Sequence, residues 1–415
     1  MLGYIFMVAF KAVFSLVLYV PDFYAMVQHG VTGEISGEKT ISGYIEVDNG
    51  KIFYEKTGEG EAFVFIHDGI VHRETWDDQF KYFAGDYKVV RYDRRGYGRS
   101  EPPTAVFSNI EDLHQLFKQL KIPSAHLMGC SAGGRLAIDF TLAYPELVKS
   151  LILVGPAVNG YGFTEHFFTR GGRYKADYKG NTDAWIKYWT MEDPYEMAAS
   201  NTAARERLRK MMENNHQNFN PDNTVFWRED FPSARGRLAE IKVPTLVVVG
   251  EYDHPDVHAH TGIISCGMTG AQRVVIRGAG HLVHMEQPDI FNRLVGQFLK
   301  NEDFIAVIKK EGACKAVALF HKIRLQKPDE IPFTETAVNN LGYEFLQCGK
   351  TDEAQLLFKL NVEAYPKSFN VYDSYGEILL TQGDTLHSVE NYKKSLQLNP
   401  NNNNAVAILR ELGVN

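Results

Sequence analysis

Residues 129–133 read Gly-Cys-Ser-Ala-Gly, and this short stretch decides how the sequence around it is interpreted. Residues 125–128 before it form an apolar run typical of a buried strand, and residues 134–140 after it are typical of a helix. A tight turn between a strand and a helix strains the backbone of Ser131 and lifts its hydroxyl clear of the sheet. The flanking glycines have a steric reason, because a Cβ atom at either position would collide with its neighbours. We therefore predict an exposed, reactive serine at this turn.

A serine hydroxyl needs a base to activate it, and the base needs an acid to orient it. Residues 244–250 are rich in β-branched side chains and predict a buried strand, and Asp253 follows the end of this run. A second such run, residues 273–277, leads into His281. Open α/β sheets bind ligands outside the carboxyl ends of their strands. We therefore expect Ser131, Asp253 and His281 at one edge of a parallel sheet.

The chain order serine, acid, histidine resembles that of the α/β-hydrolase superfamily. The resemblance runs from about residue 43 to about residue 300. Beyond the serine turn, it rests on residues 65–69, 91–100, 250–253, 278–281 and 286–288. It implies a mostly parallel, doubly wound sheet.

The resemblance also implies a role for each of the three residues. Ser131 would be the nucleophile, His281 the general base and then acid, and Asp253 the orienting carboxylate. The implied reaction is hydrolysis of carboxylic esters of small, largely apolar substrates through an acyl-enzyme, without a cofactor or a metal. Two alternatives stay open: a C–C bond hydrolase of ring-cleavage products with the same three residues, and a partner-binding protein that uses the hydrolase domain as a scaffold. Serine at this position argues against dehalogenases and epoxide hydrolases, which use a carboxylate.

An oxyanion hole is implied at two backbone N–H groups, those of Ala132 and Gly69. The sequence departs from the family here, because Asp68 follows His67 where the family usually has glycine. A carboxylate at this position could oppose a developing oxyanion. The second oxyanion donor is therefore less firmly indicated than the three catalytic residues.

Composition narrows the range of functions. The 415 residues carry a net charge of −7 without a block of like charges, so no basic stripe indicates nucleic-acid binding. The four cysteines are widely spaced without a C-x-x-C pattern, which argues against zinc held by thiolates. Residues 254–260 contain three histidines and Asp256, a group that could suggest a metal. Because this stretch lies in a loop and at a helix start, we interpret it as a hydrated surface.

The first twenty residues are nearly all apolar, and Lys11 is their only charged residue. This length suits a signal peptide or a membrane anchor, although a basic n-region is missing. We expect export or anchoring, with residues 1–20 in contact with a membrane and residues 1–33 outside the folded domains. The alternatives are a packed N-terminal helix and a cytoplasmic protein.

The hydrolase domain is predicted at residues 34–301. Alternating residues around Asn49-Gly50 predict a hairpin with a type I′ turn. Apolar runs and helical stretches then alternate, which predicts the parallel sheet. The strands stop after residue 155, and we predict a helical cap at about residues 158–240 whose aromatic side chains in part face an apolar substrate.

The last third of the chain, residues 302–415, is predicted to be all-helical. A shift of 34 residues aligns Gly342 with Gly376 and Phe358 with Tyr392. This period resembles that of tetratricopeptide repeats, which implies a surface for a protein partner or for self-association. We expect repeats at about residues 335–368 and 369–402, a degenerate helical pair at residues 302–324, and linkers at residues 300–303 and 326–332.

Overall fold

The structure is a computed structural model that describes residues 40–170, 181–198, 200–220, 223, 227–228 and 232–414. It divides into two compact units, Met1–Asn292 and Arg293–Asn415. The apolar stretch at residues 1–20, for which export or anchoring is predicted, lies outside the described residues. Across the described ranges, no helix is both long and apolar enough to cross a membrane.

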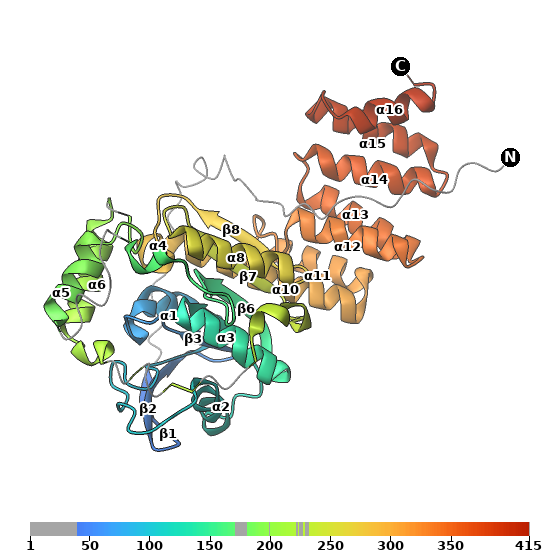
Figure 1. Cartoon of the computed structure of the whole chain (residues 1–415). Coiled ribbons are helices and arrows are strands. Elements are labelled where there is room, and N and C mark those ends of the chain that lie inside the picture. The colour runs from blue at the N-terminus through green and yellow to red at the C-terminus, as the bar shows by residue number, and fades with distance from the viewer. Residues whose placement is uncertain are drawn as a thin grey trace. The chain divides into compact units, whose positions relative to one another are not determined.

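The first unit is built on one sheet of eight strands in the order β1-β2-β4-β3-β5-β6-β7-β8 (Figure 1). β2 pairs antiparallel with β1 and β4, and the other neighbours pair in parallel. The strands are β1 (Ile41–Val47), β2 (Gly50–Thr57), β3 (Ala62–Ile66), β4 (Lys88–Tyr92), β5 (Ala125–Cys130), β6 (Val148–Val154), β7 (Thr245–Gly250) and β8 (Gln272–Ile276). The predicted α/β fold with a mostly parallel sheet is confirmed.

Helices fill the connections between these strands and follow the last strand. They are η2 (Arg73–Trp76), α1 (Asp77–Phe83), α2 (Asn109–Gln119), α3 (Ala132–Ala143), η3 (Pro145–Leu147), α8 (Pro255–Gly267), α9 (Val283–Glu286) and α10 (Pro288–Glu311). β3, β5 and β7 are buried at every residue. Parallel strands covered on both faces have this burial, which explains why the sequence shows continuous apolar runs instead of alternation.

Helix α2 shows how local sequence sets an element. The Ser108 hydroxyl accepts a hydrogen bond of 3.2 Å from the backbone N–H of Glu111, which caps the first turn. Ile110, Leu113 and Leu116 recur at helical spacing and are buried in the main core. This apolar stripe fixes the face that α2 turns toward the sheet.

The predicted hairpin is present, but its turn is not the predicted one. Val47 pairs with Gly50, so Asp48 and Asn49 are the two turn residues. Only Asn49 has a positive φ, of 56°. A type I′ turn needs positive φ at both central residues, so the prediction of such a turn at Asn49-Gly50 is wrong.

Between β6 and β7 the chain leaves the sheet for a long insertion. Its described elements are short: α4 (Glu165–Phe168), α5 (Thr182–Lys187), a π-helical turn η6 (Tyr188–Glu192), α6 (Thr202–Glu213), η7 (His216–Phe219), η8 (Ala234–Gly236) and η9 (Leu238–Glu240). The elements described in the insertion are thus helical, while Trp227 forms an isolated parallel β-bridge with Phe107. That it acts as a cap remains a prediction.

The second unit is all-helical where it is described. Helix α10 runs without a break through residues 300–303, so the linker predicted there is wrong. The elements that follow are α11 (Ala313–Gln326), α12 (Glu335–Gln347), α13 (Thr351–Ala364), α14 (Phe369–Thr381), α15 (Thr385–Leu398) and α16 (Asn403–Glu411). They stack one after another along the chain (Figure 1).

The period of 34 residues is visible in the packing of this unit. α14 and α15 begin and end 34 residues after α12 and α13. A Cβ atom on Gly342 would lie 2.8 Å from the Phe358 ring, and one on Gly376 would lie 3.2 Å from the Tyr392 ring. The glycines therefore let each pair of helices approach closely, and the aromatic ring of the second helix fills the space.

Side-chain hydrogen bonds repeat with the same period. The Asn361 amide donates to the backbone oxygen of Glu335 at 2.9 Å, and the Ser395 hydroxyl donates to that of Phe369, also at 2.9 Å. Both bonds tie the second helix of a pair to the start of the first. The repeat in the sequence is therefore also a repeat in structure.

Candidate active site

Ser131 lies in the turn between β5 and α3, with φ 52° and ψ −113°. Positive φ is uncommon for a residue with a Cβ atom, and such strain costs about 1–3 kcal/mol. The N–H of Ser131 donates to the backbone oxygen of Val154 at 2.9 Å, which ties the turn to the end of β6. Ser131 is half-buried as a residue. The strained strand–turn–helix setting is as predicted.

The glycines on either side of Ser131 are required by close contacts. A Cβ atom on Gly129 would lie 2.4 Å from the backbone oxygen of Gly133. One on Gly133 would lie 2.4 Å from the backbone oxygens of Ile66 and His67. The serine turn therefore packs directly on the loop that carries His67.

The structure brings Asp253 and His281 together. Asp253 follows β7, His281 follows β8, and Nδ1 of His281 lies 2.8 Å from Oδ2 of Asp253. Both side chains contact Gly155, where a Cβ atom would lie 2.8 Å from the imidazole and 3.0 Å from the Asp253 carboxylate. Gly155 comes directly after Val154, the residue to which Ser131 bonds. Ser131, Asp253 and His281 therefore lie at neighbouring strand ends, and among the hydrogen bonds of the described residues none joins the Ser131 hydroxyl to His281.

The surroundings of His281 favour its charged form. Burial by itself lowers the pKa of His281, but the charge and hydrogen bond of Asp253, together with the charge of Glu196, outweigh burial and raise the pKa to about 9. An imidazole held by a carboxylate at Nδ1 keeps Nε2 for proton transfer. The pair can therefore act as an oriented base once it has lost its extra proton.

Glu196 is a second acid beside His281, and no pattern in the sequence indicated it. It is 2% exposed, and burial raises its pKa to about 7, against the opposing charges of His281 and Arg170. Arg170 contacts it at 3.6 Å and bonds more closely to Asp193, at 2.9 Å. The inserted segment thus places a buried charge network next to the histidine.

Glu286 ties the histidine loop to the insertion. One carboxylate oxygen accepts from the N–H of Gly280 and the other from the N–H of Ala198, both at 2.7 Å. The N–H of His281 donates to the backbone oxygen of Tyr195 at 2.9 Å. The insertion therefore holds the loop in place. The sequence marked Glu286 only as part of the family resemblance and gave it no role.

The two predicted oxyanion donors are neighbours. A Cβ atom on Gly69 would lie 3.7 Å from the Cβ atom of Ala132. Among the hydrogen bonds of the described residues, none uses the N–H of either one. Nδ1 of His67 donates to the backbone oxygen of Asp68 at 2.8 Å, and its Nε2 accepts from the N–H of Arg94 at 2.9 Å. Burial and the Arg94 charge hold the pKa of His67 well below its usual range, so this imidazole is a neutral support for the loop.

The histidine-rich stretch after Asp253 is buried, and its interpretation as a hydrated surface is wrong. His254 and His260 have no exposed surface. Nδ1 of His260 accepts from the N–H of Val158, and the Asp256 carboxylate accepts from the N–H and the hydroxyl of Thr164. These side chains hold the first part of the insertion against α8. Within the described ranges, no cluster of His, Cys, Asp or Glu is arranged to hold a metal ion.

The aromatic residues of the insertion separate into two groups. Tyr188 and Trp189 are buried. Phe163 lies with its ring centre 4.5 Å from that of His260, and Phe167 lies 5.2 Å from His254. The second group therefore lies beside the loop that carries the acid.

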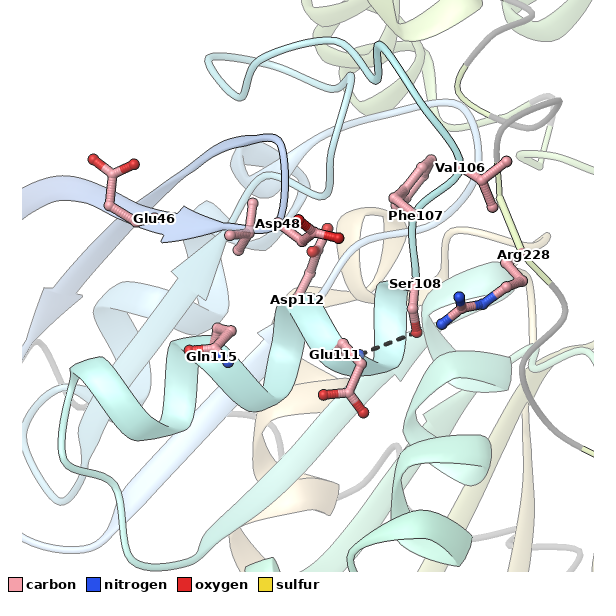
Figure 2. A pocket seen from close by; sticks show the side chains of 10 residues that line it. Glu46, Asp48, Val106, Phe107, Ser108, Glu111, Asp112, Gln115 and Arg228 are labelled. Carbon is pink, nitrogen blue, oxygen red and sulfur yellow. Dashed lines mark hydrogen bonds between the residues drawn. The ribbon is translucent and has the colours of Figure 1, made fainter.

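A hollow of about 300 Å³ lies elsewhere, between the β1–β2 hairpin and α2 (Figure 2). Acidic side chains line much of it, among them Glu46, Asp48 and Glu111. Asp112 also lines it but is held by Arg95 at 2.7 Å. None of the predicted site residues lines this hollow, so the serine turn remains the candidate site.

A model of the family described as "Alpha/beta hydrolase family" matches residues 63–294, which is more than half of the chain. The chain belongs to the α/β hydrolase family. A 2-hydroxy-6-oxononadienedioate/2-hydroxy-6-oxononatrienedioate hydrolase of Burkholderia vietnamiensis is 30% identical to this α/β hydrolase, and the match covers 64% of the chain and 98% of the relative.

Solved structures agree with this family. Est816, described as an N-acyl homoserine lactone degrading enzyme, is 27% identical, with a TM-score of 0.53 over 61% of this chain and 98% of its own. The enol-lactonase of Burkholderia xenovorans LB400 shares the fold, with a TM-score of 0.53 at 22% identity over 62% of this chain and 100% of its own. This α/β hydrolase is therefore an enzyme of the hydrolase class with small-molecule substrates.

Proposed function

We propose that this α/β hydrolase cleaves carboxylic esters of small, largely apolar substrates, with Ser131, His281 and Asp253 as its catalytic residues. The observation that carries the proposal is the 2.8 Å contact of His281 with Asp253, beside a serine held at φ 52°. The identification of Est816 as a lactone-degrading enzyme supports it, because a lactone is a cyclic ester.

The proposed mechanism assigns one role to each of these residues. Ser131 Oγ attacks the acyl carbon, and its proton passes to Nε2 of His281, while Asp253 stabilises the imidazolium that forms. The N–H groups of Ala132 and Gly69 bind the oxyanion. His281 then protonates the leaving alcohol, which leaves an acyl-enzyme on Ser131. Water, deprotonated by His281, cleaves this intermediate and restores the serine.

Charge around His281 favours an uncharged ester over the alternative of C–C bond cleavage. The relative from Burkholderia vietnamiensis is named for nonadienedioates, which carry two carboxylates. In this chain Asp253 and Glu196 lie beside the histidine, and Arg170 bonds to Asp193 and contacts Glu196. When His281 is neutral, as the base must be, Asp253, Glu196 and Asp193 outnumber Arg170, so a dianion would meet like charge there.

Two measurements test the proposed function. A fluorophosphonate probe should label the wild-type protein and not Ser131→Ala, and the same change should lower kcat on a p-nitrophenyl ester by about 10⁴-fold or more. Ser124→Ala, in the loop before β5, is the matched control and should keep its labelling. Faster turnover of a nonadienedioate than of any neutral ester would favour the alternative, and full turnover by Ser131→Ala would refute the mechanism.

We propose separate roles for the second unit and for residues 1–20. The second unit would be a tetratricopeptide-like interaction domain for a protein partner or for self-association, supported by the 34-residue period of its helices. The sequence places the domain boundary at residues 301/302. Residues 1–20 would serve export or membrane contact, supported by their apolar composition. Cell fractionation and sedimentation of the purified protein test these two proposals separately.

A further inference from the structure

Asp68 departs from the family pattern, and its two carboxylate oxygens have different environments. The side chain is 2% exposed. Oδ1 accepts from the N–H of Ile70 at 2.7 Å and from that of Val71 at 2.9 Å. Oδ2 is fully buried and has no hydrogen-bond partner among the described residues. One oxygen therefore shapes the loop, and the other is left for a group that the protein does not supply.

Asp68 lies next to the serine turn, because an added Cβ atom on the following residue, Gly69, would lie 3.7 Å from the Cβ atom of Ala132. It directly precedes Gly69, one of the two proposed oxyanion donors. Its charge acts on Cys130, the residue before Ser131, on Glu196 and on the Tyr97 hydroxyl, and it is itself influenced by His281. The guanidinium of Arg94 bonds to the backbone oxygen of Asp68 and not to its carboxylate. No cation among the described residues forms an ion pair with this carboxylate.

Burial determines which protonation state fits this position. It raises the pKa of Asp68, and the bonds from Ile70 and Val71 and the charges of His281 and Arg94 oppose it only in part. An ionised carboxylate would leave a charged Oδ2 buried without a partner, which is more costly than a neutral group. It would also repel the oxyanion of the proposed reaction. A neutral acid removes the repulsion and lessens the cost of burial, since Oδ1 still accepts the two N–H bonds and Oδ2 carries a proton instead of a charge.

We propose that Asp68 is a neutral carboxylic acid that donates a hydrogen bond from Oδ2 to the acyl oxygen of the substrate. The inference rests on the proposed ester hydrolysis. The proton stays on Asp68 throughout, so no bond to it breaks, and the acid adds a third donor to the N–H groups of Gly69 and Ala132. A buried carboxylic acid kept neutral for this purpose is chemically sound.

Infrared difference spectroscopy tests the protonation state without a substrate. At pH 7, the spectrum of the full-length wild-type protein minus that of Asp68→Asn should contain the carbonyl stretch of a protonated carboxylic acid. Only a carboxylate band in its place would overturn the proposal. The infrared spectrum does not depend on esterase activity, and labelling of Ser131 does not depend on Asp68. A negative result for the neutral Asp68 can therefore be told apart from a negative result for ester hydrolysis.

Kinetics test the donated hydrogen bond. Asp68→Ala removes the donor and the loop bonds and should lower kcat by about 10²-fold, the usual effect of losing an oxyanion donor. Asp68→Asn offers an N–H in place of the O–H and should lower kcat by at most about tenfold. In wild type, kcat should fall at alkaline pH as Asp68 ionises, and this fall should be absent in Asp68→Asn. A faster Asp68→Asn enzyme, or equal losses in both variants, would contradict the proposal.

Discussion

The two units of this chain use their glycines differently. In the first unit, Gly155 has φ 47° and lies against the His281–Asp253 pair with no space for a Cβ atom. In the second, Gly349 and Gly383 have φ 75° and 84° at helix ends, with nothing within 4 Å of an added Cβ atom. The first unit therefore uses a strained, closely packed glycine beside its proposed reactive groups. The second unit combines close helix contacts at Gly342 and Gly376 with open glycines at helix ends, and so repeats one packing unit.

Charge divides the units in the same way. The first unit buries Glu196, Asp253 and Arg170 beside a histidine. The second unit surrounds Phe345 and Phe358 with apolar side chains, and its ion pairs, such as that of Lys300 with Glu330, lie at the surface. Buried charges of this kind are costly and cluster at functional sites. The comparison predicts that substitutions in the first unit change chemistry and those in the second change stability.

The largest loss of kcat should come from changing Asp253, the acid of the His281–Asp253 pair. Asp253→Asn should lower kcat by about 10⁴-fold, because the amide stabilises the wrong tautomer of His281. Asp256→Asn, three residues away, should leave most of kcat. Its carboxylate accepts hydrogen bonds from Thr164, so its loss should lower thermal stability. Kinetics and melting curves of both variants measure this, and the opposite ranking of kcat would move the acid to Asp256.

A pair of glycine substitutions compares the units directly. Gly155→Ala would place a methyl group 2.8 Å from the imidazole and should lower kcat by about 10²-fold through displacement of His281. Gly349→Ala, the matched change in the second unit, should leave kcat unchanged and cost about 1 kcal/mol of unfolding free energy, because its φ is positive. Equal kinetic effects of the two changes would remove the distinction between the units.

Removing the charge of Glu196 should change the pH dependence of activity. The base must be unprotonated, so the raised pKa of His281 places the acid limb of kcat/KM near pH 9 instead of near 6.5. Glu196 supports the charged imidazole, and Glu196→Gln should therefore shift this limb to lower pH. Measuring kcat/KM against pH for the wild-type protein and for Glu196→Gln tests this shift. A limb that does not move would show that Glu196 has no electrostatic effect on His281.

The smallest kinetic effect should follow removal of the repeats. Ending the chain after Glu311 keeps α10 whole, and every proposed site residue lies between His67 and Glu286. We expect kcat/KM to stay within about threefold of wild type. Stability should fall, because Phe304 and Ile308 lose the apolar core they share with α11 and α12. A folded truncation without esterase activity would mean that the repeats complete the site.

The sequence predicted the sheet well because β-branched runs and glycine turns are local signals. It proposed Ser131, Asp253 and His281 as catalytic residues because each follows a recognisable strand, and it found the 34-residue period by self-alignment. It failed where the outcome depended on distant contacts. The turn at Asp48-Asn49, the unbroken helix α10 and the burial of His254 and His260 are such cases. Gly155 could have been predicted as part of the site, because a glycine directly after a strand is a recognisable signal. No pattern in the sequence indicated Glu196.

Sequence alone therefore determined the fold class, the order of the proposed catalytic residues and the helical repeat, because these depend on periodicity and on residue types at strand ends. Tertiary structure decided the electrostatics of the site. Glu196 reaches His281 only because Glu286 and Tyr195 hold the insertion against the histidine loop. Asp68 is buried with one oxygen free only because its loop folds back on Oδ1. The charge state of a group depends on burial and on neighbours remote in sequence, and only the folded chain brings these together.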